Sequence, residues 1–175
     1  MAWVNRNRLD DQFARIEDHH SLKWYKESDM YKAYDASFAV TRNTYARMIS
    51  LYNYTRTKIL NMGEERAEDY TNYDTLLSAA KKDIVSFIED IQQLDFAGKN
   101  DQLYYINDVD VTIDCEELCN RNYLNDFFNV DDLIRHERRV MGYEDKPFYT
   151  NKFVDTVATI YKDEIEHFGY KPRYE

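Results

Sequence analysis

Large side chains recur at steps of three and four residues along an unbroken pattern from Tyr31 to Met62. A period of 3.5 residues places these side chains on one face of a helix, and no Gly or Pro interrupts the pattern. We therefore predict one helix about 48 Å long, at 1.5 Å per residue, whose stripe packs against another helix. The stripe comprises Tyr31, Tyr34, Phe38, Thr41, Tyr45, Met48, Tyr52, Thr55, Ile59 and Met62.

Glycine and proline are scarce, with Gly 4 and Pro 2 in 175 residues, which favours long helices over sheets. Each glycine follows a helical pattern, where a left-handed residue is expected to end the helix. These glycines are Gly63, Gly98, Gly142 and Gly169. The patterns predict helices over about residues 6–20, from 21 or 29 to 62, from 71 or 74 to 97, from 130 to 141, and after Thr150.

One segment has a different pattern. Two short apolar or aromatic runs flank Asn107-Asp108, and the second run alternates apolar with polar residues from Val109 to Ile113. This alternation predicts a β-hairpin near residues 103–113. The predicted fold class is all-α: an elongated antiparallel bundle of four to five helices with this small hairpin, forming a single helical domain over residues 1–175.

Net charge and hydropathy exclude several classes of protein. A net charge of −10 argues against a general binder of nucleic acid or of anionic membranes. No segment approaches the roughly 20 apolar residues of a membrane span, and the amino end has no apolar core of a signal peptide. We expect a cytoplasmic protein, or one within a virion, with Cys115 and Cys119 as reduced thiols.

Acidic residues are concentrated between Asp101 and Asp132, where nine acids occur against Arg121 alone, whereas residues 36–63 contain four bases and no acid. Two explanations stay open. The acids are neutralised within the fold or face solvent, or they bind a cationic protein or imitate a phosphate backbone. The candidate partner-binding residues are Asp108, Asp110, Asp114, Glu116, Glu117, Asp126, Asp131 and Asp132.

Two Glu-x-x-His pairs, Glu17–His20 and Glu164–His167, have the spacing of ligands in di-metal carboxylate bundles. Such a site also needs an inward-facing Glu on each of two further helices, and the two long apolar stripes contain no Glu. Cys115, Cys119 and His136 supply at most three of the four ligands of a zinc site. We therefore expect no metal, no cofactor and no catalytic residue.

The predicted function is a non-enzymatic structural or partner-binding subunit of a larger assembly, of ring or connector type. Sixteen tyrosines exceed what one small core needs, and Tyr is enriched at protein interfaces. The abundance of Tyr and Asn resembles small proteins encoded by viruses or phages. The alternatives are an acidic inhibitor that imitates nucleic acid and a di-metal enzyme. We assign helix packing to Tyr31, Tyr34, Phe38, Tyr45, Met48, Tyr52 and Ile59.

Overall fold

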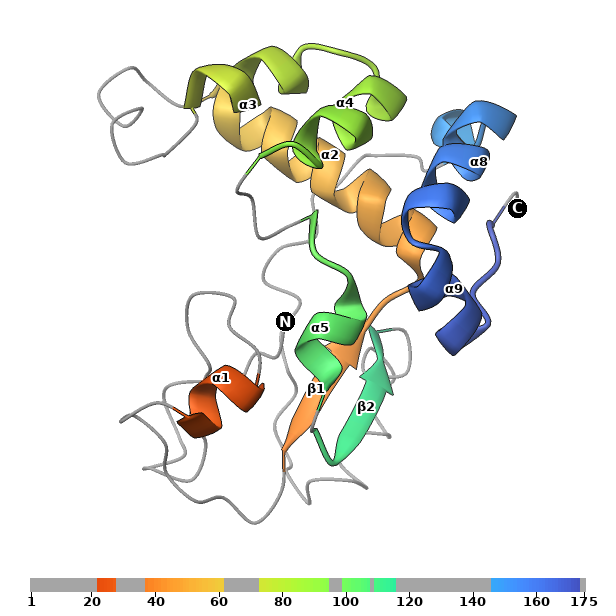
Figure 1. Cartoon of the computed structure of the whole chain (residues 1–175). Helices are drawn as coiled ribbons and strands as arrows, with labels where there is room; N and C mark the ends of the chain where they lie inside the picture. Colours follow the sequence, from red (N-terminus) through yellow and green to blue (C-terminus); the bar gives the residue numbers. More distant parts are fainter. Residues whose placement is uncertain are drawn as a thin grey trace, which may run out of the picture. The chain divides into compact units, whose positions relative to one another are not determined.

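The structure, a computed structural model, describes residues 22–27, 37–61, 73–94, 99–107, 109–115 and 146–173. These residues are mostly helical and include one two-stranded sheet, which confirms the helical character of the chain (Figure 1). The elements are α1 (Leu22–Glu27), β1 (Phe38–Thr41), α2 (Thr44–Leu60), α3 (Tyr73–Ala80), α4 (Ile84–Ile91), α5 (Gln102–Ile106), β2 (Val111–Asp114), η3 (Lys146–Phe148), α8 (Asn151–Ile160) and α9 (Lys162–Phe168).

The chain divides into two compact units. The first unit comprises Met1–Arg42 and Asp101–Arg139, and its described elements are α1, β1, α5 and β2. The second unit comprises Asn43–Asn100 and Val140–Glu175, and its described elements are α2, α3, α4, η3, α8 and α9. A single helical domain stays a prediction, and each unit is described by itself.

In the first unit, β1 and β2 pair in parallel, with Phe38 opposite Val111 and Thr41 opposite Asp114. The predicted hairpin near residues 103–113 is therefore wrong. Its second strand exists as β2 but pairs with β1, and its first strand is the helix α5. Residues 102–106 are strand-favouring in composition, but the cap at Asp101 commits them to a helix, so the β-branched residues of β2 pair with those of β1 instead.

Side-chain hydrogen bonds explain why residues 102–106 form a helix beside β1. The Asp101 carboxylate caps α5 by accepting a hydrogen bond from the Leu103 N–H at 2.7 Å. The buried Gln102 amide accepts from the Arg42 N–H at 2.7 Å and donates to the Arg42 carbonyl at 2.8 Å. This reciprocal pair satisfies the backbone directly after β1 and fixes α5 against it.

In the second unit, α2 begins at Thr44, so the predicted continuous helix from Tyr31 to Met62 is wrong. The Asn43 side chain accepts hydrogen bonds from the N–H groups of Tyr45 and Ala46, at 3.1 and 3.4 Å. Asn is a strong N-cap, and an N-cap residue has a non-helical backbone, so the helix starts there and not earlier. Residues 38–41 instead form β1 of the first unit, while Tyr31, Tyr34 and Met62 lie outside the described residues.

The predicted helix from 71 or 74 to 97 is divided into α3 and α4. Asp83 has extended backbone angles, φ −67° and ψ 164°, and its carboxylate accepts from the N–H groups of Val85 and Ser86. The Asp83 cap therefore starts a new helix within a pattern that is continuous in sequence. All the apolar residues of α4 are buried, namely Ile84, Val85, Phe87, Ile88 and Ile91.

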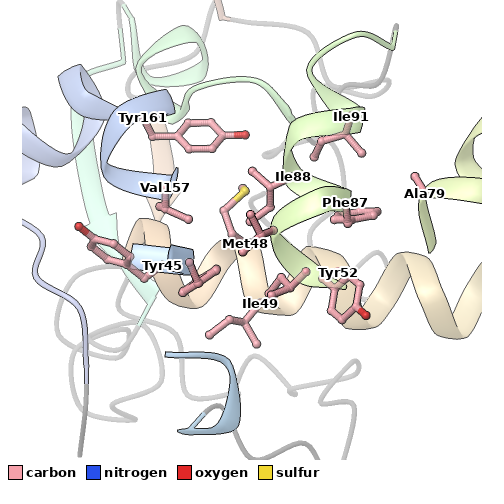
Figure 2. Close-up of a cluster of buried hydrophobic side chains, with 13 residues drawn as sticks. Tyr45, Met48, Ile49, Tyr52, Ala79, Phe87, Ile88, Ile91, Val157 and Tyr161 are labelled. Atoms are coloured by element: carbon pink, nitrogen blue, oxygen red, sulfur yellow. The ribbon is translucent and has the colours of Figure 1, made fainter. Parts of the chain in front are cut away.

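The core of the second unit lies where α2, α4 and α8 meet (Figure 2). Met48, Ile49, Phe87, Ile88 and Ile91 are each 0% exposed. In Figure 2 Met48 of α2 lies next to Ile88 of α4, with Val157 and Tyr161 beside them. Large residues on more than one side of α2 are buried because this helix packs against α3, α4 and α8.

The carboxyl-terminal part matches two expectations. A helix begins after Thr150, whose hydroxyl accepts from the Phe153 N–H at 3.2 Å. Gly169 ends α9 in the left-handed region, at φ +66°. The other glycines lie outside the described residues, as do the predicted helices over 6–20 and 130–141. Nowhere in the described part of the chain is a helix long and apolar enough to cross a membrane.

Candidate functional site

The structure describes three acids of the acidic segment, namely Asp101, which caps α5, and the two candidate partner-binding residues Asp110 and Asp114. The Asp110 carboxylate accepts hydrogen bonds from the Ser37 hydroxyl at 2.6 Å and from the Ser37 N–H at 2.7 Å. The hydroxyl bond, followed by the N–H bond, lowers the pKa of Asp110 below its ordinary value of 3.8. Asp110 is exposed, so it presents a fixed negative charge where β1 and β2 begin.

Asp114 lies at the other end of β2, opposite Thr41, and is half-buried. The remaining candidate partner-binding residues lie outside the described residues. They are Asp108, Glu116, Glu117, Asp126, Asp131 and Asp132. Asp110 and Asp114 therefore lie at opposite ends of β2, and Asp110 also bridges to Ser37 at the start of β1.

The second unit contains a buried charged cluster around Glu164, whose spacing from His167 in the sequence indicates only a candidate metal ligand. Glu164 of α9 is 0% exposed and is the only charged residue among the buried positions of the described residues. One of its oxygens accepts from the Thr44 hydroxyl at 2.5 Å, and the other accepts from the Arg47 guanidinium at 2.9 Å. A buried carboxylate is tolerated only when it is paired and hydrogen-bonded, and both conditions are met here.

Arg47 connects this acid to two further segments of the second unit. Its guanidinium donates to the Asn100 carbonyl at 3.0 Å and lies over the Tyr161 ring, 5.1 Å from the ring centroid. The Tyr161 hydroxyl donates to the Lys99 carbonyl at 2.9 Å and accepts from the Gln92 amide at 3.1 Å. The cluster therefore joins α2, α9, the end of α4 and residues 99–100.

The geometry of this cluster suits a structural role. Its carboxylate oxygens are bound by Thr44 and Arg47, and both Glu164 and Thr44 are 0% exposed, so the carboxylate offers no surface to a substrate. Glu164 also does not share a site with His167, because His167 is exposed and its ring lies against Phe168. The second predicted pair, Glu17–His20, lies outside the described residues.

The sequence carries a signal for the buried position of Glu164, at the carboxyl end of α8 and the start of α9. Phe153, Val157 and Tyr161 form a buried stripe along α8, and Glu164 follows at the next helical step. An acid at a core position predicts a buried partner of opposite charge. The identity of that partner, 117 residues earlier in the chain, is not readable from local pattern.

An apolar groove of about 340 Å³ opens on the second unit beside Tyr52. It is formed by α2, the start of α4, η3 and the start of α8. Figure 2 shows Tyr52 at the margin of the core cluster, with its hydroxyl directed away from the other labelled side chains. The lining residues are Tyr52, Asp83, Ile84, Val85, Pro147, Phe148, Thr150 and Lys152.

Three polar groups of the groove wall are engaged by the fold. The Tyr52 hydroxyl donates to the Lys82 carbonyl at 2.8 Å. Thr150 and Asp83 cap α8 and α4. The hydrogen bond from the Ser86 hydroxyl, at 2.8 Å, is the largest of the effects that lower the pKa of Asp83 below 3.8. The wall therefore offers a ligand mainly apolar surface.

Among the described residues, no three His, Cys, Asp or Glu side chains lie together in a way that could hold a metal ion. No protein-family model, no curated protein and no solved structure matches the chain. The buried cluster, the exposed acid at the sheet and the apolar groove are therefore the features from which function is inferred.

Proposed function

We propose that this protein is a non-catalytic, partner-binding subunit of a larger protein assembly. The observation that carries the proposal is the groove beside Tyr52. Its wall is apolar, and its hydroxyl and carboxylate groups already serve the Lys82 carbonyl and the amino ends of α4 and α8. Such a surface suits an apolar side chain of another protein better than a small polar substrate.

The buried cluster is consistent with this proposal. A general acid or base must reach the proton that it transfers, to within hydrogen-bond distance in a bound substrate. The Glu164 carboxylate is closed off by Thr44 and Arg47 and has no exposed surface. We assign it to stability instead of catalysis.

Light scattering coupled to size-exclusion chromatography tests the proposal. The single chain has a mass of 21.1 kDa, so a subunit of a ring or connector should elute at a multiple of that mass as its concentration rises. A mass of one chain at every concentration would contradict self-assembly. The elongated antiparallel bundle is part of the same proposal, and small-angle X-ray scattering of the purified chain measures that shape.

Asp110 favours a second candidate function, an acidic inhibitor that occupies the cationic channel of a nucleic-acid enzyme. Its exposed carboxylate is held by Ser37 and stays ionised at neutral pH, as an imitation of phosphate requires. A cytoplasmic location, or one within a virion, belongs to both proposals. Binding of the chain to such an enzyme should weaken steeply as salt rises from low to physiological concentration.

Charge reversal separates the two functions. Reversing Asp108, Asp110 and Asp114 should weaken binding to the enzyme and leave assembly intact if the acids imitate nucleic acid. A matched control reverses three exposed acids outside the segment, Glu89, Asp155 and Glu166, and makes the same change in net charge. Equal losses from the two triple variants would show that net charge alone, and not the acidic segment, governs the association.

A further inference from the structure

We propose that the groove beside Tyr52 is the docking site for an acidic segment of a partner protein, which inserts one aromatic or large aliphatic side chain. This inference rests on the proposed function and adds the site and the chemistry of the partner. Three observations carry it: the apolar wall, the engagement of the wall's polar groups by the fold, and the cations at the margin.

The apolar wall of the groove and the small volume of the groove favour the insertion of a single side chain. Ile84, Val85, Pro147 and Phe148 line the groove together with the Tyr52 ring. The Tyr52 ring is also held in place, since it packs edge-to-face against Phe87 and Phe148 at 5.3 and 5.8 Å between centroids. A volume of about 340 Å³ lies at the lower end of the range for ligand pockets, so it admits one large side chain more readily than an extended ligand.

The polar groups in the wall are already hydrogen-bonded within the protein, so they do not select a small polar ligand. The Tyr52 hydroxyl donates to a backbone carbonyl, and the Thr150 hydroxyl accepts from a backbone N–H. The Asp83 carboxylate accepts from Val85 and Ser86. The charge of Asp83 is also stabilised by the amino end of α4, whose N–H groups it caps. Its repulsion of an incoming carboxylate is correspondingly reduced.

The remaining charges at the margin are positive. Arg56 is exposed and donates to the Tyr52 hydroxyl at 3.0 Å, with its guanidinium 5.5 Å from the centroid of the same ring. Among the described residues no carboxylate lies within ion-pair distance of Arg56, and α2 contains no acid. Lys152 is exposed in the first turn of α8 and lines the groove.

Lys82, which is next to Asp83, is already neutralised by Asp90 at 2.6 Å. Lys152 also interacts electrostatically with the Asp83 carboxylate of the same wall, so Arg56 is the main cation for a partner and Lys152 adds a second, partly offset positive charge. Each suits a carboxylate that lies beside the inserted apolar side chain, since opposite charges at the rim of an interface steer association and fix orientation. An acidic segment with an apolar anchor meets both features at once.

Fluorescence anisotropy with a labelled synthetic peptide tests this inference on the full chain. The probe is Asp-Glu-Phe-Glu-Asp, with two matched peptides: one carries Ala in place of Phe, and the other carries Lys in place of every acid. Replacing Phe by Ala should weaken binding roughly ten- to hundredfold, the value of burying one aromatic side chain. At physiological salt, which screens the net charge of −10, the lysine peptide should bind the groove least, because it meets Arg56 and Lys152 with like charge.

Substitutions in the protein locate the site. Arg56→Glu and Lys152→Glu should each weaken binding of the acidic peptide roughly three- to tenfold, as expected for exposed ion pairs. The matched controls are Lys58→Glu, on another face of α2, and Lys162→Glu, on α9, which make the same change in charge away from the groove. All four residues are exposed, so the melting temperatures should stay close to that of the wild type.

Three results would overturn the inference: no binding of the acidic peptide, equal binding of the acidic and lysine peptides, or equal losses in the groove and control variants. Self-association of the chain that Arg56→Glu abolishes would show a second copy as the occupant and would also overturn it. If the chain assembles but does not bind the peptide, only the docking site in the groove is refuted. If the chain binds the peptide but does not assemble, only the role as an assembly subunit is refuted.

Discussion

The ion pair between Arg47 and Glu164 allows the sharpest prediction about stability. In Arg47→Met the aliphatic part of the side chain is kept and the charge is lost, which leaves Glu164 at 0% exposure with Thr44 as its hydrogen-bond donor on one oxygen. Removing one partner of a buried pair costs about 3–5 kcal/mol, because the carboxylate stays buried after losing the guanidinium that offsets its charge. That is a large fraction of the roughly 5–15 kcal/mol that stabilises a typical domain.

Glu164→Gln should cost less. The amide keeps an acceptor for Thr44 or Arg47, and the Arg47 side chain is 18% exposed, so water can compensate part of its charge. The expected loss is about 1.5–3 kcal/mol, the value of a hydrogen bond to a charged group. The double variant Arg47→Met/Glu164→Gln should cost less than the sum of the single losses, because the neutral amide does not need the guanidinium to offset a charge.

Urea denaturation followed by circular dichroism measures these free energies, and thermal melting provides a second readout. For a chain of this size, about 2–4 °C of melting temperature corresponds to each kcal/mol, so Arg47→Met should melt roughly 6–20 °C below the wild type. The reasoning is refuted if Arg47→Met costs less than about 1 kcal/mol, the value of an exposed ion pair, or if the two substitutions are additive.

Three further predictions concern caps, core and sheet. Asp83→Ala should destabilise the chain by about 1 kcal/mol, the value of an N-cap. Because the pKa of Asp83 is lowered in the folded chain, the carboxylate's contribution to stability is present above pH 3.8 and is lost as pH falls through the lowered pKa. Denaturation of the wild type and of Asp83→Ala at pH 7 and at acidic pH measures this difference. Tyr45→Ala should cost about 3–5 kcal/mol because Tyr45 is buried, whereas Phe38→Ala should cost less because Phe38 is half-buried; equal losses of melting temperature would contradict the assigned burial. Asp110→Asn should weaken the hydrogen bonds that Ser37 donates and speed hydrogen exchange in β1 and β2, and unchanged exchange would show that this contact does not hold the sheet.

The buried face of α2 follows from the sequence because helical periodicity reports burial directly. Tyr45, Met48, Tyr52, Thr55 and Ile59 recur at the helical period, and all are buried in the structure. The period does not report where the helix begins. Phe38 and Thr41 continue the same spacing although they belong to a strand. A strand of four residues contributes only two positions to the pattern, which is too few to distinguish a strand from a helix.

Helix boundaries depend on single polar residues that weigh little in a hydrophobic pattern. Asn43 and Asp83 each accept two backbone hydrogen bonds and each starts a helix, although neither interrupts the apolar period. Both are strong N-cap residues, so the sequence contained the signal. The parallel sheet is harder to predict, because four helices, α2, α3, α4 and α5, separate β1 from β2 in the sequence. Local alternation of apolar and polar residues identifies a strand but does not identify its partner.

The charge distribution along the sequence likewise shows where acids and bases occur but not which of them pair in the fold. The sequence places bases in α2 and acids in residues 101–132, which invites a direct pairing of the two regions. In the structure the carboxylate that binds Arg47 belongs to Glu164 of α9, and Arg56 binds the Tyr52 hydroxyl. The described acid Asp110 binds Ser37 within its own unit. Asp110 and Arg56, one in each unit, are the charged positions that we propose for partners of opposite sign.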